Sequence, residues 1–231
     1  MNVSKAYLLT FQQFLVLLHG KKITDLIIFE ELQQTVVNEK EIIQTISTLM
    51  VQGIVKNVEE EYVLNDEISE ILETLQNCNR ILIEYTYKNS MPARCIYITE
   101  KIVVIQIDEV SGNRIRIECF SRDTFESELF ENEILENMQA SDLLCENNNE
   151  NEYRDYEIKT VIEDTFHSDV DKLLEDDKTY LIIDQYERGN VEKIKRSIVI
   201  KNILSDFIVQ LKVGSVNIKK YTKLELLELY K

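Results

Sequence analysis

The stretch Arg114-Ile-Arg-Ile-Glu-Cys-Phe-Ser121 has a counterpart 101 residues later, in Ser215-Val-Asn-Ile-Lys-Lys-Tyr-Thr222. In both copies apolar residues alternate with polar ones, which is the pattern of a strand with one buried face. Ser121 and Thr222 then stand where an N-cap hydroxyl would accept from the first turn of a helix. The paired stretches therefore predict a pseudo-two-fold repeat in which strands are followed by a helix.

Each copy closes a longer run of predicted strands. Both runs are rich in β-branched and aromatic residues and are divided by turn residues. The first set covers 80–87, 94–99, 101–107 and 114–120, and the second covers 180–186, 195–201, 206–213 and 216–221. We predict an α+β protein with an antiparallel sheet and flanking helices, in which residues 80–231 form one continuous sheet domain.

Three segments make up this predicted sheet domain. Residues 80–145 hold the first strand set and the helices after it, and residues 159–231 hold a helix over about Lys159 to Glu175, the second strand set and a terminal helix. Between them, residues 146–158 are rich in Asn and Glu and cannot bury apolar surface, so we expect a mobile loop.

The first 79 residues predict mainly helices. Thr10 with Gln13 forms a capping box that opens a helix ended by Gly20, and Asn38 with Glu41 opens another that ends at Gly53. A helix between these two is predicted over about Asp25 to Gln33. Asp66 is predicted to cap a fourth helix, which runs to about Asn77.

The helix that begins near Asn38 is followed by a predicted hairpin of two short strands, 54–57 and 61–64. We expect the apolar residues of this helix to form its buried stripe: Ile42, Ile43, Ile46, Leu49 and Met50. Helices followed by a two-stranded wing are the order of a winged helix-turn-helix. Residues 1–79 are therefore predicted to form a winged-helix-like segment.

Charge argues against DNA as the partner of this segment. Residues 1–79 hold five lysines and no arginine against twelve acidic residues, and the tip of the wing is Glu59-Glu60-Glu61. The whole chain has a formal net charge of -16. Phosphate backbones and anionic membranes require local positive potential. We expect no nucleic-acid binding, and use of the segment for packing against protein.

No segment of the chain predicts membrane insertion or secretion. No apolar run reaches the about 18 residues of a spanning helix, and residues 1–20 lack the basic start and cleavage site of a signal peptide. We expect a cytoplasmic protein. The cysteines Cys78, Cys95, Cys119 and Cys145 have no CxxC spacing and are interpreted as buried free thiols.

We predict neither an enzyme nor a cofactor site. No spacing pairs a nucleophile with a base, and none of the five glycines forms a phosphate-binding loop. The two histidines, His19 and His167, have no neighbouring ligand residues, so no metal site is expected. Catalytic, cofactor-binding and metal-binding residues are therefore all assigned as none.

The connection between the first two predicted strands is the most unusual loop. It contains Tyr87, Met91 and the only proline, Pro92. An exposed aromatic residue and a methionine would make an adaptable apolar contact for a partner. The same residues also fit a turn that folds back on its own sheet. We name Tyr87, Met91 and Pro92 as candidate partner-binding residues.

The order of these parts resembles the EspG family of type VII secretion chaperones. The resemblance lies in Leu9-Thr-Phe-Gln-Gln-Phe-Leu-Val-Leu-Leu-His-Gly20, in Thr48-Leu-Met-Val-Gln-Gly-Ile-Val55, in the acidic-capped helix that leads into strands, and in the closing strand and helix from Val216 to Tyr230. It covers nearly the whole chain, but consists of hydrophobic patterns without a catalytic signature. The Asn, Lys, Ile and Glu content indicates a low-GC genome, unlike the mycobacteria in which the family is generally found.

The resemblance implies a cytosolic, ATP-independent chaperone that holds the end of a helical-hairpin secretion substrate, of the WXG or LXG type or an analogous one, by shape and apolar contact. Two other interpretations stay open. One is a winged-helix transcriptional regulator with a β sensor domain. The other is an acidic immunity or antitoxin-like protein that neutralises a basic toxin through its negative field.

Overall fold

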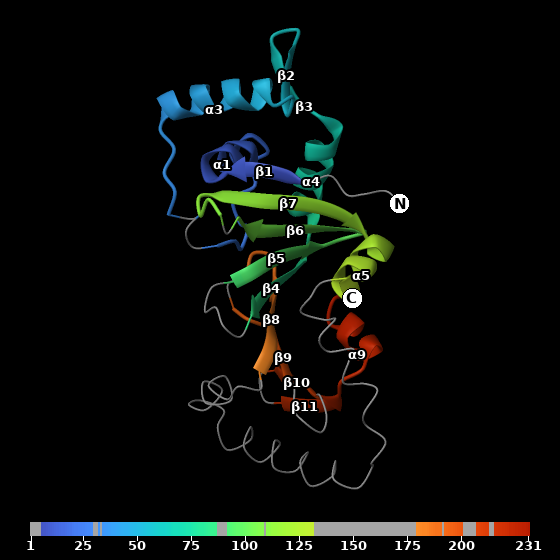
Figure 1. The fold of residues 1–231 in the computed structure, drawn as a ribbon. Helices are drawn as coiled ribbons and strands as arrows, with labels where there is room; N and C mark the ends of the chain where they lie inside the picture. Colours follow the sequence, from blue (N-terminus) through green and yellow to red (C-terminus); the bar gives the residue numbers. More distant parts are fainter. Residues whose placement is uncertain are drawn as a thin grey trace, which may run out of the picture. The chain divides into compact units, whose positions relative to one another are not determined.

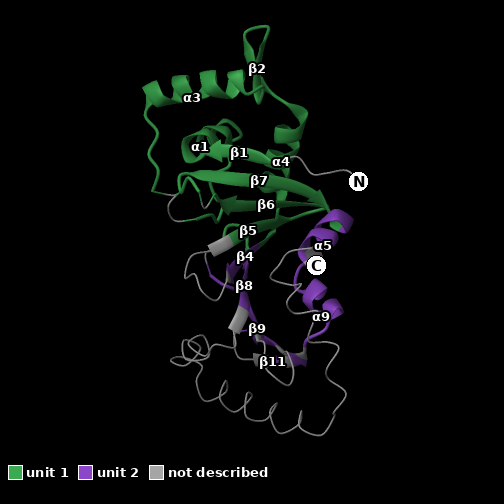
Figure 2. Cartoon of the chain, in the orientation of Figure 1, with its two compact units in different colours: residues 1–81, 93–122, 187–191 green, residues 82–92, 123–186, 192–231 purple. Residues whose placement is uncertain are grey.

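The computed structural model describes residues 6–29, 32, 34–86, 92–108, 110–131, 179–190, 192–200, 207–212 and 215–231 (Figure 1). The chain divides into two compact units, each assembled from separate stretches (Figure 2). Unit 1 comprises residues 1–81, 93–122 and 187–191, and unit 2 comprises residues 82–92, 123–186 and 192–231. The predicted loop 146–158, the predicted helix 159–175 and Cys145 lie outside the described residues.

The described residues of unit 1 include three helices, a four-stranded antiparallel arrangement and a separate hairpin. The helices are α1 (Phe11–Gly20), α3 (Glu39–Val51) and α4 (Asp66–Asn77). The strands β1 (Tyr7–Thr10), β7 (Arg114–Ser121), β6 (Lys101–Ile107) and β5 (Pro92–Ile98) are hydrogen-bonded in that order. The separate hairpin joins β2 (Val55–Val58) to β3 (Glu61–Leu64).

Unit 2 contains most of β4 (Arg80–Thr86), followed in the strand order by β8 (Thr179–Glu187), β9 (Lys195–Ile200), β10 (Phe207–Lys212) and β11 (Ser215–Lys220). The pairs β8–β9, β9–β10 and β10–β11 are antiparallel. Among its described residues are the helices α5 (Arg122–Glu131) and α9 (Lys223–Glu228). The α+β class with an antiparallel sheet is confirmed.

The predicted order of strand and then helix is present at both positions, with β7 before α5 and β11 before α9. Thr222 caps α9, because its hydroxyl accepts from the Glu225 N–H at 3.1 Å. Phe125 and Leu226, which correspond in the two copies, are both buried. The pseudo-two-fold relation itself remains a prediction.

Both predicted capping boxes in unit 1 are confirmed. The Thr10 hydroxyl accepts from Gln13 N–H at 3.2 Å, and the Gln13 side chain accepts from Thr10 N–H at 2.9 Å. Asn38 and Glu41 make the same reciprocal bonds at the start of α3. Gly53 ends this region with φ 71°, a left-handed conformation that glycine adopts without strain.

The predicted helix over Asp25 to Gln33 is wrong over its first five residues. Residues 23–29 form neither helix nor strand. They are held by distant parts of unit 1: the Tyr97 hydroxyl donates to the Ile27 carbonyl at 2.7 Å, and Asp25 accepts from Arg188. Ile23 and Phe29 are buried in this irregular segment. Tertiary contacts have overridden the local helical pattern.

The predicted buried stripe of α3 is also wrong in part. Leu49 is fully buried, but Ile43 and Met50 are exposed, and the side chain that accompanies Leu49 inward is Thr45. Helix α3 packs on α1, and the Gln13 side-chain amide donates to Oε1 of the Gln52 side chain at 3.0 Å. Helix α3 therefore carries apolar side chains that the described part of unit 1 does not bury.

Candidate partner-binding surfaces

The connection between β4 and β5 occurs where it was predicted, since β4 ends at Thr86 and β5 begins at Pro92. Tyr87 and Met91 lie outside the described residues. Pro92 is the first residue of β5, a position where a missing N–H is tolerated. The structure thus places the strands on either side of this connection. The partner-binding role of Tyr87, Met91 and Pro92 stays a prediction.

A second candidate surface lies on α3 and on the hairpin that follows it. We call the β2–β3 hairpin the wing, and we define the α3–wing surface by six exposed apolar side chains: Ile43, Met50, Val51, Val58, Tyr62 and Val63. Ile43 and Met50 are seven residues apart, close to two helical turns, so they lie in one line along α3. Val51 is 89% exposed at the last position of the helix. Figure 1 shows β2 and β3 rising from this end of α3.

The wing exposes apolar residues on both of its faces. The register pairs Lys56 with Val63 and Val58 with Glu61, so these four side chains share one face. The opposite face carries Asn57 and Tyr62 and is anchored at its base by the buried Val55. Val58 and Val63 are diagonal neighbours on the first of these faces. Sequence alternation in these short strands cannot tell which face is covered.

The base of the wing is fixed to the rest of unit 1 by hydrogen bonds. The Ile54 N–H donates to the Leu49 carbonyl at 3.0 Å, and the Asn65 N–H donates to the Ile54 carbonyl at 2.9 Å. The Asn65 side chain donates to the Gly53 carbonyl at 3.2 Å. Its Oδ1 accepts from the Ile68 N–H at 2.8 Å, so the residue that caps α4 is Asn65 and the predicted cap at Asp66 is wrong. These bonds hold the wing at a defined place beside the end of α3.

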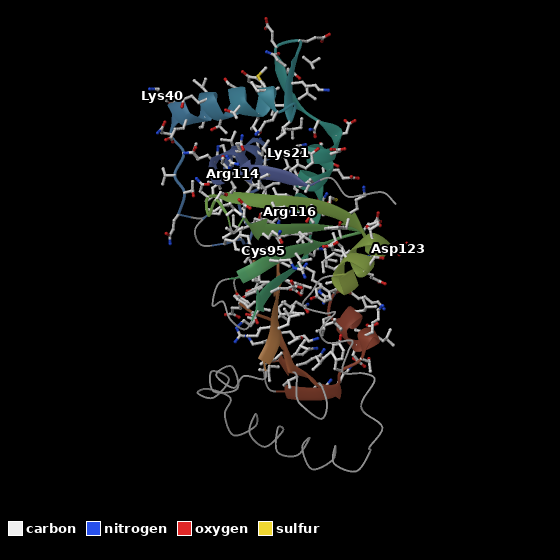
Figure 3. The ribbon with its side chains drawn as sticks, in the orientation of Figure 1. Lys21, Lys40, Cys95, Arg114, Arg116 and Asp123 are labelled. Atoms are coloured by element: carbon white, nitrogen blue, oxygen red, sulfur yellow. The ribbon has the colours of Figure 1, made fainter. Side chains whose placement is uncertain are left out.

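Acidic residues surround the apolar side chains of the α3–wing surface. Between residues 39 and 61 the chain has five glutamates and two lysines. Glu59, Glu60 and Glu61 form the exposed wing tip, and Glu39 and Glu41 lie in the first turn of α3. Lys40 is at the end of α3 away from the wing (Figure 3). This surface therefore combines apolar contact area with net negative charge.

Buried polar groups elsewhere serve structure. In unit 2, Asp184 is buried and accepts from Arg196 Nε at 2.7 Å and Arg196 Nη2 at 2.8 Å, with Lys193 Nζ 2.8 Å from the same carboxylate. The hydrogen bond to Asp184 raises the pKa of Arg196. In the described part of the chain, no three His, Cys, Asp or Glu residues are grouped as a metal ion would require.

The described cysteines are free thiols. Cys78 and Cys95 are buried as predicted, and Cys119 is half-buried on β7. Burial raises the pKa of Cys78, and burial together with the nearby Glu70 raises the pKa of Cys119 to about 11. Thiols of this kind are weak nucleophiles at neutral pH. Within the described residues, no helix has both the length and the apolar character needed to span a membrane.

These features define an α+β protein whose described exposed apolar groups gather on a helix and a hairpin. No protein-family model matches the chain, and no curated protein matches it. Among solved structures, the chain is similar to the type VII secretion system chaperone EspG5 of Mycobacterium tuberculosis, solved in complex with a PE25–PPE41 dimer. The similarity has a TM-score of 0.52 at 11% sequence identity, and covers 97% of this chain and 94% of that chain. The fold is a distant EspG-like fold.

Proposed function

We propose that this protein is a cytoplasmic, non-enzymatic chaperone that binds a helical secretion substrate of a type VII-like system and keeps it soluble for export. The observation that carries this proposal is the extent of the fold similarity. It includes 97% of this chain and 94% of EspG5, so both chains correspond over nearly their full length. Similarity over one common motif alone would have been much weaker support for a shared role.

The chemistry of the chain supports a binding protein. The buried Asp184 is paired with Arg196, and the described thiols are shielded or have a raised pKa. Recognition by a chaperone requires shape and apolar contact, with no reacting group. A net charge of -16 keeps such a carrier soluble while its own apolar surface is in use.

We further propose that the client contacts Tyr87, Met91 and Pro92 in the connection between β4 and β5. An aromatic ring and a methionine adapt to different apolar partners, and the proline limits the conformational entropy lost on binding. The client would present the end of a helical hairpin, as the family resemblance implies.

The test is co-expression of the full chain with small helical proteins encoded beside secretion genes of the same genome. A client should form aggregates alone and a defined complex with this chain, measured by size-exclusion chromatography with light scattering. Because the contact is apolar, the complex should persist from about 50 to about 500 mM salt. Recovery of DNA, or of a basic toxin in a complex that dissociates with salt, would replace the chaperone proposal by one of its alternatives.

The proposed contact residues are tested in the same assay. Tyr87→Ala with Met91→Ala should weaken client binding at least about tenfold, since each removes a large apolar side chain from the contact. Leu224→Ala is the matched control, because Leu224 is an exposed apolar residue of α9, far along the chain from the β4–β5 connection. Equal binding by both variants would remove this loop from the client site and leave the chaperone proposal standing.

A further inference from the structure

We propose that the α3–wing surface is a docking site for a basic amphipathic helix of a partner protein. This inference does not depend on the proposed chaperone function. It rests on three properties of the surface: its exposed apolar side chains, the acidic residues around them, and the short strands of the wing.

The apolar side chains are concentrated on this surface. Six of the ten large apolar side chains that are exposed among the described residues belong to α3 and the wing. Scattered single exposures need no explanation, whereas a cluster of this kind marks an interaction site. Ile43 and Met50 lie in one line along α3, and the exposed Val51 lies about a quarter turn around the helix from Met50. Val58 and Val63 share one face of the wing, and Tyr62 is on its other face. The surface offers apolar contact along a helix axis and beside a hairpin.

The charge of the surface selects the occupant. Glu39, Glu41 and the wing-tip glutamates outnumber Lys40 and Lys56, so an approaching partner gains from lysine and arginine. A second copy of this chain would bring the same glutamates and would be repelled. Nucleic acid would bring phosphates and would be repelled for the same reason. A partner with an apolar stripe and basic flanks satisfies both properties of the surface.

The geometry favours a helix over an added strand. β2 and β3 have four residues each, so a strand added to the wing could form only a few main-chain hydrogen bonds. Ile43 and Met50 are spaced by two turns of α3, and a partner helix with apolar residues at positions i, i+3 or i+4, and i+7 matches this spacing.

The backbone conformation of the wing tip is further support for a role of its negative charge. Glu59 and Glu60 have φ values of 51° and 69°, and these two residues form the turn between β2 and β3. A two-residue hairpin turn with positive φ strongly prefers Asn-Gly or a similar pair. The chain has glutamate at both positions in spite of that preference. The cost in stability is consistent with selection for negative charge at this place.

The probe is a labelled synthetic peptide of about 18 residues, with leucine at every third or fourth position and lysine elsewhere, long enough to form a helix on binding. Fluorescence anisotropy measures its affinity for the full-length protein. A scrambled peptide of the same composition and a peptide with glutamate in place of lysine are the peptide controls. Strong binding only by the basic amphipathic peptide is expected. Equal binding by the scrambled peptide would overturn the proposal, because it would show general attraction to an acidic protein.

Neutral substitutions localise the binding. Val51→Ser with Val58→Ser leaves the net charge unchanged and should weaken peptide binding at least tenfold. Val110→Ser with Leu224→Ser is the matched control, since these two exposed apolar residues lie outside the α3–wing surface. A second pair tests charge: Glu59→Gln with Glu60→Gln should reduce the affinity and its salt dependence more than Glu100→Gln with Glu187→Gln, which are also exposed. Indistinguishable test and control pairs would overturn the proposal.

Sedimentation equilibrium of the same proteins tests whether a second copy of the chain occupies the α3–wing surface. The unsubstituted protein and Val51→Ser with Val58→Ser should have the same mass in solution. A dimer that the two substitutions convert to a monomer would assign the surface to a second copy of the chain and overturn the assignment to a basic helix.

Discussion

Arg188 donates from Nε and Nη2 to the two carboxylate oxygens of Asp25, at 2.9 Å and 2.6 Å, and so joins two segments that are 163 residues apart in the chain. The same guanidinium donates from Nη1 to the Leu75 carbonyl at 3.1 Å. Both partners belong to unit 1, and the pair holds the irregular segment 23–29 in place. Arg188, which follows the end of β8, therefore helps to organise residues 23–29.

Substitution of Arg188 should lower the free energy of unfolding more than substitution of Asp25. Arg188→Ala removes the bidentate pair and the bond to Leu75, and should lower the free energy of unfolding by about 1–2 kcal/mol. Asp25 is about half exposed, so the pair is partly screened and Asp25→Asn should cost only about 0.5 kcal/mol. Urea denaturation of the two variants measures both values. A larger cost for Asp25→Asn would contradict this ranking.

The Asp25 pair should also depend on pH. The hydrogen bond from Arg188 holds the pKa of the Asp25 carboxyl below its usual value. A carboxyl with a lowered folded pKa contributes stability above its unfolded pKa, and that stability disappears as the pH falls through the folded pKa. The stability difference between the unsubstituted protein and Asp25→Asn should therefore be present at about pH 7 and vanish toward about pH 2. A difference that is constant over this range would rule out the pair as its source.

Tyr230 should anchor α9 within unit 2. Its hydroxyl donates to the buried Glu84 carboxylate, and its ring meets Phe125 edge-on with centroids 5.6 Å apart. Tyr230→Phe should destabilise by about 1.5–3 kcal/mol because a buried carboxylate loses a donor. Tyr230→Ala should cost about 3–5 kcal/mol, since the ring packing is lost as well. Guanidinium unfolding is the measurement, and Tyr62→Phe at an exposed tyrosine should change little.

The buried Asp184–Arg196 pair should be far less tolerant of single than of double substitution. Asp184→Ala leaves the guanidinium of Arg196 without its carboxylate and should destabilise by about 2–4 kcal/mol, below the cost at a fully buried pair because Arg196 is one-quarter exposed. Asp184→Leu with Arg196→Met should cost less than Asp184→Ala alone. Thermal unfolding of the three proteins checks this order, and equal losses would show that the pair is not coupled.

Cys119 should react slowly until the solution is strongly alkaline. Its pKa is raised to about 11 by burial and by Glu70. Because the thiolate reacts, the rate of alkylation by iodoacetamide should rise about tenfold per pH unit from about pH 7 to about pH 10. Mass spectrometry of the Cys119 peptide measures this rate. A plateau near pH 8 would contradict the raised pKa.

Truncation of a buried side chain of α3 should change the free energy of unfolding much more than truncation of an exposed one. Leu49→Ala should cost about 2–5 kcal/mol, because Leu49 is fully buried. Ile43→Ala should change the free energy of unfolding by only about 0.5 kcal/mol, because Ile43 is 69% exposed. Urea denaturation distinguishes the exposed position seen in the structure from the buried position that the sequence pattern predicts.

The sequence by itself determined those features that depend on neighbouring residues. The capping boxes at Thr10 and Asn38 and the cap at Thr222 are interactions between residues three apart, so their sequence patterns were sufficient to place three helix starts. Strands β7 and β11 were likewise readable, because their apolar residues recur with the strand period of two. Strand β6 was readable from its run of β-branched residues. The α+β class follows from these local patterns.

Tertiary structure alone decided which local patterns prevailed and which apolar residues are buried. Residues 23–29 have helical periodicity, yet Tyr97 and Arg188, distant in sequence, hold them in an irregular path. The four-residue β1 carries too weak a pattern to be recognised, and pairing with β7 makes it a strand. Ile43 and Leu49 are both apolar, but only Leu49 is buried. Burial depends on contacts between distant segments, and one-dimensional periodicity does not encode which of two apolar faces those segments will cover.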